Sequence, residues 1–401
     1  MNRLENKNKI AIVVVGYNRL NSIKRLLDSL LDAQYPSNDI PLVISIDCSG
    51  CTELYDYVRQ FEWPYGEKYV IIQEIRLGLK EHIFRCGDLT EYFKAIILLE
   101  DDLFVSPFFY DYVLQAVDAY GDEDRIAEIS LYKNERNGYV GLPFIEVQDG
   151  SDVFLRQAVS SWGQCWTSMM WTAFKEWYTT NDVEEKIKTA DMPVVIKGWE
   201  RAWSKYYYAY LLDQQKYVLY PHVSLSTNFS EAGEHGNQGN SNEQVVLMQG
   251  NFTYKMPSFE KLVRYDIYFN NESIYTWLGM SRDEIILDMY GFHELDKKKK
   301  YILTTLELPC QKVRSYGLVF RPWEMNIKNG VPGEGITLYE LDEFSVAKKA
   351  QRYNKSVGQY FLRAGNHQII RNAARANFVA DIRRLIIRLK NKISRILGLR
   401  K

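Results

Sequence analysis

The sequence has few cysteines and no long apolar run. Its five cysteines among 401 residues are an odd number scattered along the chain, which favours free thiols in a reducing compartment over a disulfide scaffold. Apolar stretches such as residues 11–15 and 95–99 are far shorter than the roughly 18 to 20 residues that a membrane-spanning helix needs. The polar first nine residues lead directly into a strand-like run. We therefore expect no signal peptide and a cytoplasmic protein.

An overall excess of one charge is also absent, because 50 Lys and Arg balance 51 Asp and Glu. This balance hides an asymmetry. Residues 371–401 carry ten basic residues and one acid, which leaves 40 basic and 50 acidic residues in the first 370. An acidic body without an RNA- or DNA-binding motif gives little support for nucleic-acid binding. With 46% apolar residues, the chain is long enough for two or three domains with a sizeable core, so disorder and collagen are excluded.

The first 130 residues alternate apolar strands with amphipathic helices. This alternation predicts an α/β fold of the Rossmann-like kind, with a mostly parallel sheet and helices on both faces. Asn21 or Ser22 can cap the first helix, which extends to residue 31. The other expected helices span residues 52–61, 81–93 and 107–120, and the expected strands span residues 10–15, 41–47, 69–75, 95–99 and 125–131.

The regular alternation of strands and helices ends after residue 150. The aromatic residues 160–177 are expected to begin as a loop and continue as a helix, followed by a helix at 199–212 and a strand at 218–220. Residues 224–244 are rich in Ser, Asn and Gly, which indicates a long loop of the kind that often carries function. Strand-like runs follow at 301–308, 313–320 and 335–341. We expect a main domain at 1–250, an accessory β-containing region at 251–365 and a basic amphipathic helix at 366–401.

Acidic residues follow two of the expected strands. Asp47 ends the second strand, and Glu100, Asp101 and Asp102 end the fourth. In open parallel sheets, ligands bind beyond these strand ends. Adjacent carboxylates repel each other unless a cation lies among them, and oxygen ligands suit Mg²⁺ or Mn²⁺. The alternative is that these acids only cap the helix that begins near Pro107.

Three segments in this order, AIVVVGYNR, ISIDCSG and IILLEDDLFVSPFFYDYV, are more specific than either acidic feature alone. Together they resemble nucleotide-sugar glycosyltransferases of the GT-A fold, and most of all the N-acetylglucosaminyltransferase I type with its Glu-Asp-Asp form of the Asp-X-Asp motif. The resemblance covers roughly residues 10–245. It implies inverting transfer of a sugar from a nucleoside diphosphate sugar, with Mn²⁺ or Mg²⁺ as the cofactor.

The resemblance also implies roles for donor-site residues. Asp102 corresponds to the direct metal ligand, while Glu100 and Asp101 correspond to residues that touch the donor sugar and ribose. The remaining donor residues are Arg19 facing the diphosphate, Asp47 at the uracil ring with Cys48 beside it, His82 at the nucleotide, and His235 near the diphosphate in the loop SEAGEHGNQ.

Acceptor-side roles follow from the same likeness. Trp162 and Trp166 either line the acceptor cleft or belong to the core, which is the commoner fate of tryptophan. The catalytic base of the family lies between two tryptophans, and here Glu200 is the only acid between Trp199 and Trp203. Its rivals are Asp213, Glu231 and Glu234, and its structural alternative is an exposed residue in the first helical turn.

The sequence thus predicts a glycosyltransferase acting on a hydroxyl of a glycan or lipid-linked acceptor in surface polysaccharide synthesis. Two alternatives remain open: a nucleotidyltransferase that makes sugar nucleotides, and a catalytically dead GT-A subunit that binds glycans or acts as a scaffold. The basic residues 371–401 flank an apolar helical stripe, which predicts binding to an anionic membrane at the inner face of the cell membrane. The alternative is that this helix packs on the acidic body.

Overall fold

The computed structural model describes residues 6–229, 243–251, 253–294, 298–341, 352–353, 355–362 and 382. The chain is divided into two compact units, with the boundary after Lys299. We expected a boundary near residue 250 instead. Strand β13 (Arg264–Tyr265) is hydrogen-bonded to β9 (Val153–Arg156), so the chain beyond residue 250 still contributes to the sheet of the first unit.

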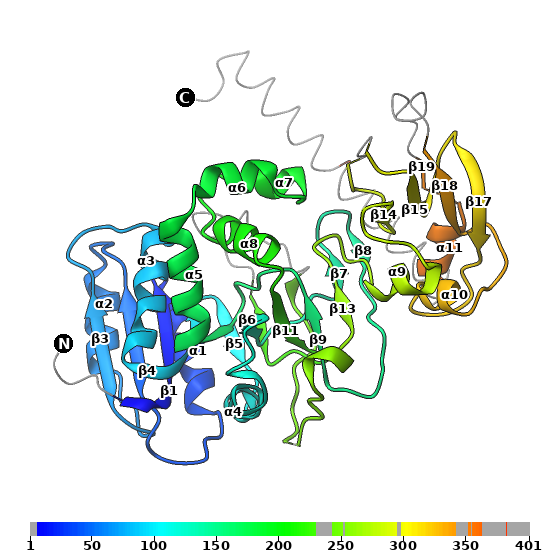
Figure 1. Cartoon of the computed structure of the whole chain (residues 1–401). Coiled ribbons are helices and arrows are strands. Elements are labelled where there is room, and N and C mark those ends of the chain that lie inside the picture. Colours follow the sequence, from blue (N-terminus) through cyan, green and yellow to red (C-terminus); the bar gives the residue numbers. More distant parts are fainter. Residues whose placement is uncertain are drawn as a thin grey trace. The chain divides into compact units, whose positions relative to one another are not determined.

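The first unit is built on a nine-stranded sheet with the order β13-β9-β11-β6-β10-β4-β1-β2-β3 (Figure 1). The strands not yet given are β1 (Asn6–Gly16), β2 (Leu42–Ile46), β3 (Lys68–Ile72), β4 (Phe93–Glu100), β6 (Ile126–Ser130), β10 (Gln164–Thr167) and β11 (Tyr217–Pro221). β3, β2, β1 and β4 are parallel, as are β6 and β11. β10 runs antiparallel between β4 and β6. The predicted α/β class with a mostly parallel sheet is confirmed.

Helices cover both faces of this sheet. On one face lie α1 (Leu20–Leu31), α2 (Thr52–Gln60) and α4 (Phe109–Tyr120), whose apolar side chains share a buried core with alternate residues of β1, β2 and β4. On the other face lie α3 (Leu79–Gly87), α5 (Ser168–Thr180) and α8 (Ser204–Asp213). α3 and α5 lie side by side (Figure 1), with the rings of Phe84 and Trp171 5.8 Å apart.

Three local expectations differ from the structure. The segment after residue 160 contains the strand β10 before its helix, and a four-residue strand with polar ends carries too little periodicity to be recognised. Helix α1 begins at Leu20, with Arg19 rather than Asn21 or Ser22 at its N-cap. Helix α8 begins at Ser204 rather than at 199, because residues 199–203 form a turn that precedes it.

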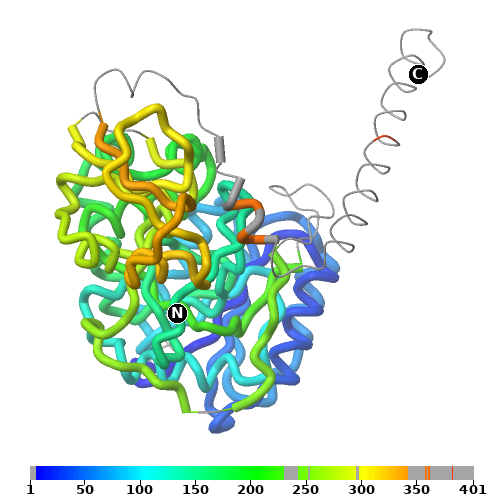
Figure 2. Tube along the Cα trace, turned by 90° about the vertical axis from the view of Figure 1, so that its right-hand side faces the viewer, coloured from blue at the N-terminus to red at the C-terminus, as the bar shows by residue number. Residues whose placement is uncertain are grey.

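Shorter elements complete the first unit. The helices are η1 (Asp88–Glu91), α6 (Val183–Thr189), α7 (Val194–Lys197), η3 (Phe259–Lys261) and α9 (Ser273–Leu278). The strands are β5 (Leu103–Val105), β7 (Arg136–Asn137), β8 (Leu142–Pro143), β12 (Ser226–Asn228) and β14 (Ile285–Asp288). Figure 2 shows residues 243–251 in light green passing along this unit. Here the Met248 carbonyl accepts the Ser106 hydroxyl at 2.5 Å.

The second unit contains the expected β-strands. β18 (Ile336–Glu340) pairs antiparallel with β15 (Tyr301–Thr304) and with β17 (Gln311–Tyr316). The other elements are β16 (Leu306–Glu307), α10 (Met325–Lys328), β19 (Arg352–Tyr353) and α11 (Lys355–Leu362). The predicted basic helix at 366–401 lies outside the described residues, apart from residue 382. No helix among the described residues is both long and apolar enough to cross a membrane.

Candidate functional site

Two acidic features meet at the carboxyl edge of the parallel strands. Glu100 is the last residue of β4, and Asp101 and Asp102 form the turn that leads to β5. Asp47 directly follows β2, and its backbone N–H donates to the carbonyl of Gly16 at the end of β1, at 2.9 Å. Because β1 lies between β2 and β4, both features lie at the edge where ligands bind in open parallel sheets.

Arg19 supplies the positive charge that the acid cluster requires. It lies in the turn between β1 and α1, and its guanidinium forms ion pairs with both Asp101 and Asp102. Nε lies 3.3 Å from Asp101 Oδ2, and Nη1 lies 3.1 Å from Asp102 Oδ2. Adjacent carboxylates repel each other unless a cation lies among them, and Arg19 meets part of this requirement.

Burial shifts the titration of this cluster. Burial raises the pKa of Asp101 to about 6, and the ion pair with Arg19 only partly offsets the rise. Burial, Asp102 and Asp101 together raise the pKa of Glu100. For Arg19 burial lowers the pKa, but Asp101 and Asp102 raise it more, so the guanidinium stays charged. A further positive charge here would favour the ionised carboxylates.

Asp102 has an oxygen available for a cation. Its Oδ1 is buried and accepts no hydrogen bond within the described part of the chain. Its backbone carbonyl accepts the N–H of Phe229 at 3.0 Å, which ties the chain after β12 to the acid cluster. A free carboxylate oxygen fits a Mg²⁺ or Mn²⁺ ion. No group of three His, Cys, Asp or Glu side chains among the described residues could hold a metal ion, so a cation at Asp102 needs additional ligands.

Asp47 organises the start of helix α3. Its Oδ1 accepts the N–H groups of Cys48 and Leu77, each at 2.8 Å, and its Oδ2 accepts the N–H of Gly78 at 2.9 Å. Gly78 has φ 77°, a conformation that favours glycine, and it is the N-cap of α3. Asp47 is 4% exposed, so its described contacts are structural, and the uracil contact stays a prediction.

Cys48 and His82 lie near Asp47 in different surroundings. Cys48 is a half-buried free thiol. His82, on α3, is 3% exposed, and its Nε2 lies 2.7 Å from the Ser45 hydroxyl. Burial lowers the pKa of His82 to about 4, against the opposing influence of Asp47, so the imidazole is neutral. Direct contact of His82 with a nucleotide stays a prediction that this packing does not favour.

The two candidate acceptor tryptophans have different environments. Trp166 is fully buried, with its ring 4.6 Å from that of Trp171, which favours the alternative that Trp166 belongs to the core. Trp162 is half-buried, its ring lies edge-on to Tyr132 at 4.7 Å, and its carbonyl accepts the Ser226 hydroxyl at 2.5 Å. β12, which carries Ser226, pairs with β5 directly after the acid cluster. Trp162 therefore stays a candidate for contact with the acceptor.

Glu200 is exposed and lies in the turn between α7 and α8, not in a helical turn. Its rival Asp213 has structural partners, since its Oδ2 accepts the Trp177 indole N–H at 2.7 Å and it pairs with Lys186. Despite burial, these partners lower the pKa of Asp213. Three further candidates lie outside the described residues: Glu231, Glu234 and His235.

A buried acid that the sequence analysis did not single out lies in β6. Glu128 is fully buried, and its Oε1 accepts the backbone N–H of Ser160 at 3.1 Å. Burial raises the pKa of Glu128 to about 8, against the lowering influence of Ser160 and Trp166. The available signal was an acid in the middle of the apolar strand IAEIS. Ser160 belongs to the segment that leads to Trp162, so this hydrogen bond from Ser160 to Glu128 holds that segment against β6.

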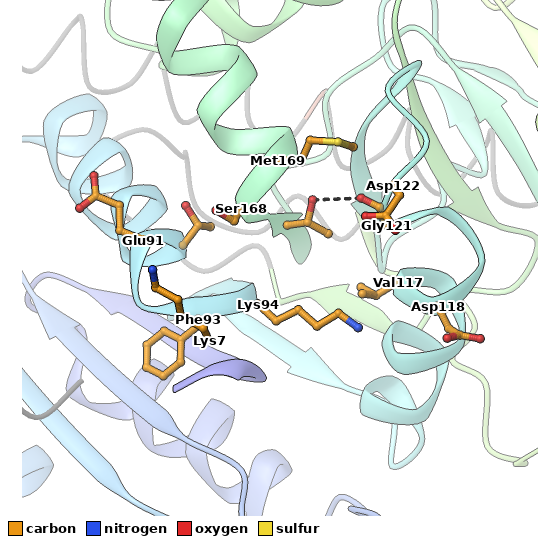
Figure 3. Close-up of a pocket in the computed structure, with 12 residues that line it drawn as sticks. Lys7, Glu91, Phe93, Lys94, Val117, Asp118, Gly121, Asp122, Ser168 and Met169 are labelled. Atoms are coloured by element: carbon orange, nitrogen blue, oxygen red, sulfur yellow. Dashed lines mark hydrogen bonds between the residues drawn. The ribbon is translucent and has the colours of Figure 1, made fainter. Parts of the chain in front are cut away.

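A cavity of about 420 Å³ lies at the opposite edge of the sheet (Figure 3). The first residues of β4 and α5 contribute to its lining, where the Thr167 hydroxyl donates to the Gly121 carbonyl at 3.4 Å. Its charged lining residues are of both signs: Lys7, Glu91, Lys94, Asp118 and Asp122. Because this cavity lies where the parallel strand β4 begins, it is separate from the acid cluster.

Comparison with known proteins gives distant structural likenesses. No protein-family model and no curated protein matches the chain. Among solved structures, S. aureus TarS (residues 1–349) with UDP-GlcNAc is 14% identical, with a TM-score of 0.37 over 57% of this chain and 60% of that one. The mannosyltransferase PcManGT from Pyrobaculum calidifontis, with GDP-Man and Mn²⁺, is 11% identical, with a TM-score of 0.32 over 47% of this chain and 53% of that one.

Proposed function

We propose that this chain is a GT-A-type glycosyltransferase that transfers a sugar from a nucleoside diphosphate sugar, most readily a UDP sugar, with inversion. The observation that carries the proposal is the acid cluster at the end of β4, with Arg19 beside it and a buried Asp102 oxygen that accepts no hydrogen bond among the described residues. It lies at the carboxyl edge of a mostly parallel sheet, as the resemblance of residues 10–245 to this class implies.

The residues divide the chemistry of transfer among them. Cleavage of the anomeric bond leaves a negatively charged diphosphate, and a divalent ion held by Asp102 would supply charge neutralisation there. Arg19 brings a second positive charge to the same place. A carboxylate on the acceptor side must accept the proton of the attacking hydroxyl, and Glu200 is our candidate. Trp162 offers an aromatic face for the acceptor sugar.

Hydrolysis of a panel of nucleotide sugars tests this proposal directly. We expect slow release of nucleoside diphosphate from one donor in the presence of Mn²⁺ or Mg²⁺ and its loss with EDTA. Asp102→Ala is the matched inactive control. Formation of pyrophosphate from a nucleoside triphosphate and a sugar phosphate would instead identify a nucleotidyltransferase. Nucleotide binding without turnover of any donor or acceptor would identify a catalytically dead subunit.

The acceptor is proposed to be a glycan or a lipid-linked oligosaccharide at the inner face of the cell membrane. This part of the proposal depends on residues 371–401, where the sequence has ten basic residues among apolar residues at helical spacing. Flotation with anionic and neutral liposomes tests it, using the full chain and a chain truncated after Asn366. Equal flotation of the two proteins would contradict membrane binding through this segment.

A further inference from the structure

The guanidinium of Arg19 lies between the carboxylates of Asp101 and Asp102 in the acid cluster. It contacts both oxygens of Asp101 and one oxygen of Asp102. The Asp101 and Asp102 side chains are only 6% and 15% exposed. Ion pairs this shielded from water are screened less by solvent and salt than surface pairs, so Arg19 is a strong competitor for any cation that approaches the same carboxylates.

Only one of the two carboxylate oxygens of Asp102 is paired with Arg19. Its Oδ2 lies 3.1 Å from Arg19 Nη1, while its Oδ1 accepts no hydrogen bond among the described residues. A divalent ion at Oδ1 would lie on the same carboxylate as the guanidinium, and the two like charges would repel each other. The described part of the chain also offers no third acidic, His or Cys ligand to such an ion. A cation alone therefore has a weak site here.

A nucleoside diphosphate would change both the number of ligands available to the cation and the repulsion between the cation and Arg19. Its oxygens can complete the coordination of a divalent ion, as phosphates commonly do for Mg²⁺. Its negative charge also gives the guanidinium of Arg19 an alternative partner, because arginine pairs with phosphate as readily as with carboxylate. Movement of the guanidinium from Asp102 to the diphosphate would relieve the repulsion at the carboxylate. Binding of either ligand then strengthens binding of the other.

We propose that Arg19 is an internal counter-ion that couples the binding of the divalent cation to the binding of the nucleoside diphosphate. This inference rests on the proposed function and adds a mechanism of ordered donor loading to it. Without the nucleotide, Arg19 partly neutralises the acid cluster and holds cation affinity low. With the nucleotide, Arg19 leaves Asp102 and the cation binds tightly. Thermodynamic linkage requires the same coupling factor in both directions.

The alternative is that Arg19 only ties the turn before α1 to the end of β4. A purely structural ion pair predicts that loss of the guanidinium leaves cation affinity unchanged or lowers it, because the carboxylates lose their alignment. An internal counter-ion predicts the opposite sign. Cation affinity in the absence of nucleotide must rise when the guanidinium is removed, and this rise separates the two explanations.

The test is a titration of the full chain with Mn²⁺, with and without UDP, in which electron paramagnetic resonance measures the free and bound Mn²⁺. We expect UDP to tighten Mn²⁺ binding in the wild type by about tenfold or more, within the usual range of such couplings. In Arg19→Gln, Mn²⁺ alone should bind about three- to tenfold more tightly, and the tightening by UDP should be smaller than in the wild type by about the same factor. Arg19→Lys keeps a charge near the cluster and should give an intermediate result. Arg59→Gln removes an exposed arginine that pairs with Asp56, and should behave as wild type.

The inference is overturned if a folded Arg19→Gln protein binds Mn²⁺ no more tightly than the wild type in the absence of UDP, or does not bind it measurably. Either result leaves the proposed function standing. If Arg19→Gln does not fold, the result with Arg19→Lys decides, since wild-type coupling in that variant contradicts a role for the guanidinium fork. Failure of the wild type to bind either UDP or Mn²⁺ contradicts the proposed function itself.

Discussion

The backbone N–H of Ser160 donates to the carboxyl group of Glu128 across 3.1 Å in the interior of the first unit. This contact joins the middle of β6 to the segment that enters β10 through Trp162. Ionisation of a fully buried carboxyl group such as that of Glu128 is costly, because burial disfavours the charged form. Burial accordingly raises the pKa of Glu128 to about 8, so the group is largely protonated at neutral pH.

Glu128→Gln is expected to reduce the pH dependence of stability. Glu128 has a higher pKa in the folded state than its ordinary 4.5, so the folded state binds more protons. Its contribution to stability is therefore complete below pH 4.5 and is lost as the pH rises to about 8, by at most about 1.4 kcal/mol for each pH unit. Urea unfolding at pH 5, 6.5 and 8 measures this slope in both proteins.

The control for this prediction is Glu81→Gln, which removes an exposed acid of α3 that pairs with Arg85. That substitution should leave the slope between pH 5 and pH 8 unchanged. Other groups with raised pKa values, such as Asp101, remain in both proteins and cancel in the comparison. An identical slope for the wild type and Glu128→Gln would show that Glu128 is ionised in the folded protein.

Asp102→Ala is expected to abolish cation-dependent donor turnover, by about 100-fold or more, while leaving the fold intact. The reason is that Asp102 is the proposed cation ligand, because its Oδ1 accepts no hydrogen bond among the described residues and its side chain is only 15% exposed at the turn after β4. Donor hydrolysis with Mn²⁺ measures the loss, and circular dichroism with thermal unfolding verifies the fold. Full Mn²⁺-dependent activity in this variant would remove Asp102 from the metal site.

Asp47→Ala is expected to weaken both nucleotide binding and the local structure. The substitution leaves the partly buried N–H groups of Cys48, Leu77 and Gly78 without their acceptor, and each of them that water does not reach costs about 1–3 kcal/mol. Thermal unfolding and calorimetric titration with UDP measure the two effects. Asp56→Ala, on the exposed surface of α2, is the control. Unchanged UDP affinity despite lower stability would restrict Asp47 to its structural role.

Most of the central sheet could be predicted from the sequence because its strands are uninterrupted apolar runs. The expected strands at 10–15, 95–99 and 125–131 coincide with β1, β4 and β6 to within a few residues. β10 was missed because all four of its residues, QCWT, are buried and the polar ones stand only at its two ends, so the strand shows no alternation of polar and apolar positions. Its place between β4 and β6 is fixed by long-range pairing, for example of Cys165 with Ile97, which local sequence does not encode.

The acid cluster could be predicted because it directly follows a strand, but its charge balance could not. Arg19 precedes Asp101 by 82 residues, and only the parallel pairing of β1 with β4 brings them together. Similarly, the sequence left open whether Trp166 lines a cleft or fills the core. Its burial depends on Trp171 of α5 and Trp203 before α8, contacts that arise only when the helices pack on the sheet.

The last prediction concerns the catalytic base. The proposed inverting transfer needs a carboxylate apart from the acid cluster, and Glu200 is exposed before α8, where a substrate can reach it. Asp213 is occupied by Trp177 and Lys186, which makes it the weaker rival. Glu200→Gln keeps the shape of the side chain and removes its basicity, so transfer should fall by roughly 10² to 10⁴ with unchanged UDP affinity. Asp213→Asn should lower thermal stability with little effect on turnover per folded molecule. Near-normal transfer by Glu200→Gln would pass the role to Glu231 or Glu234, each of which can be tested by the same substitution.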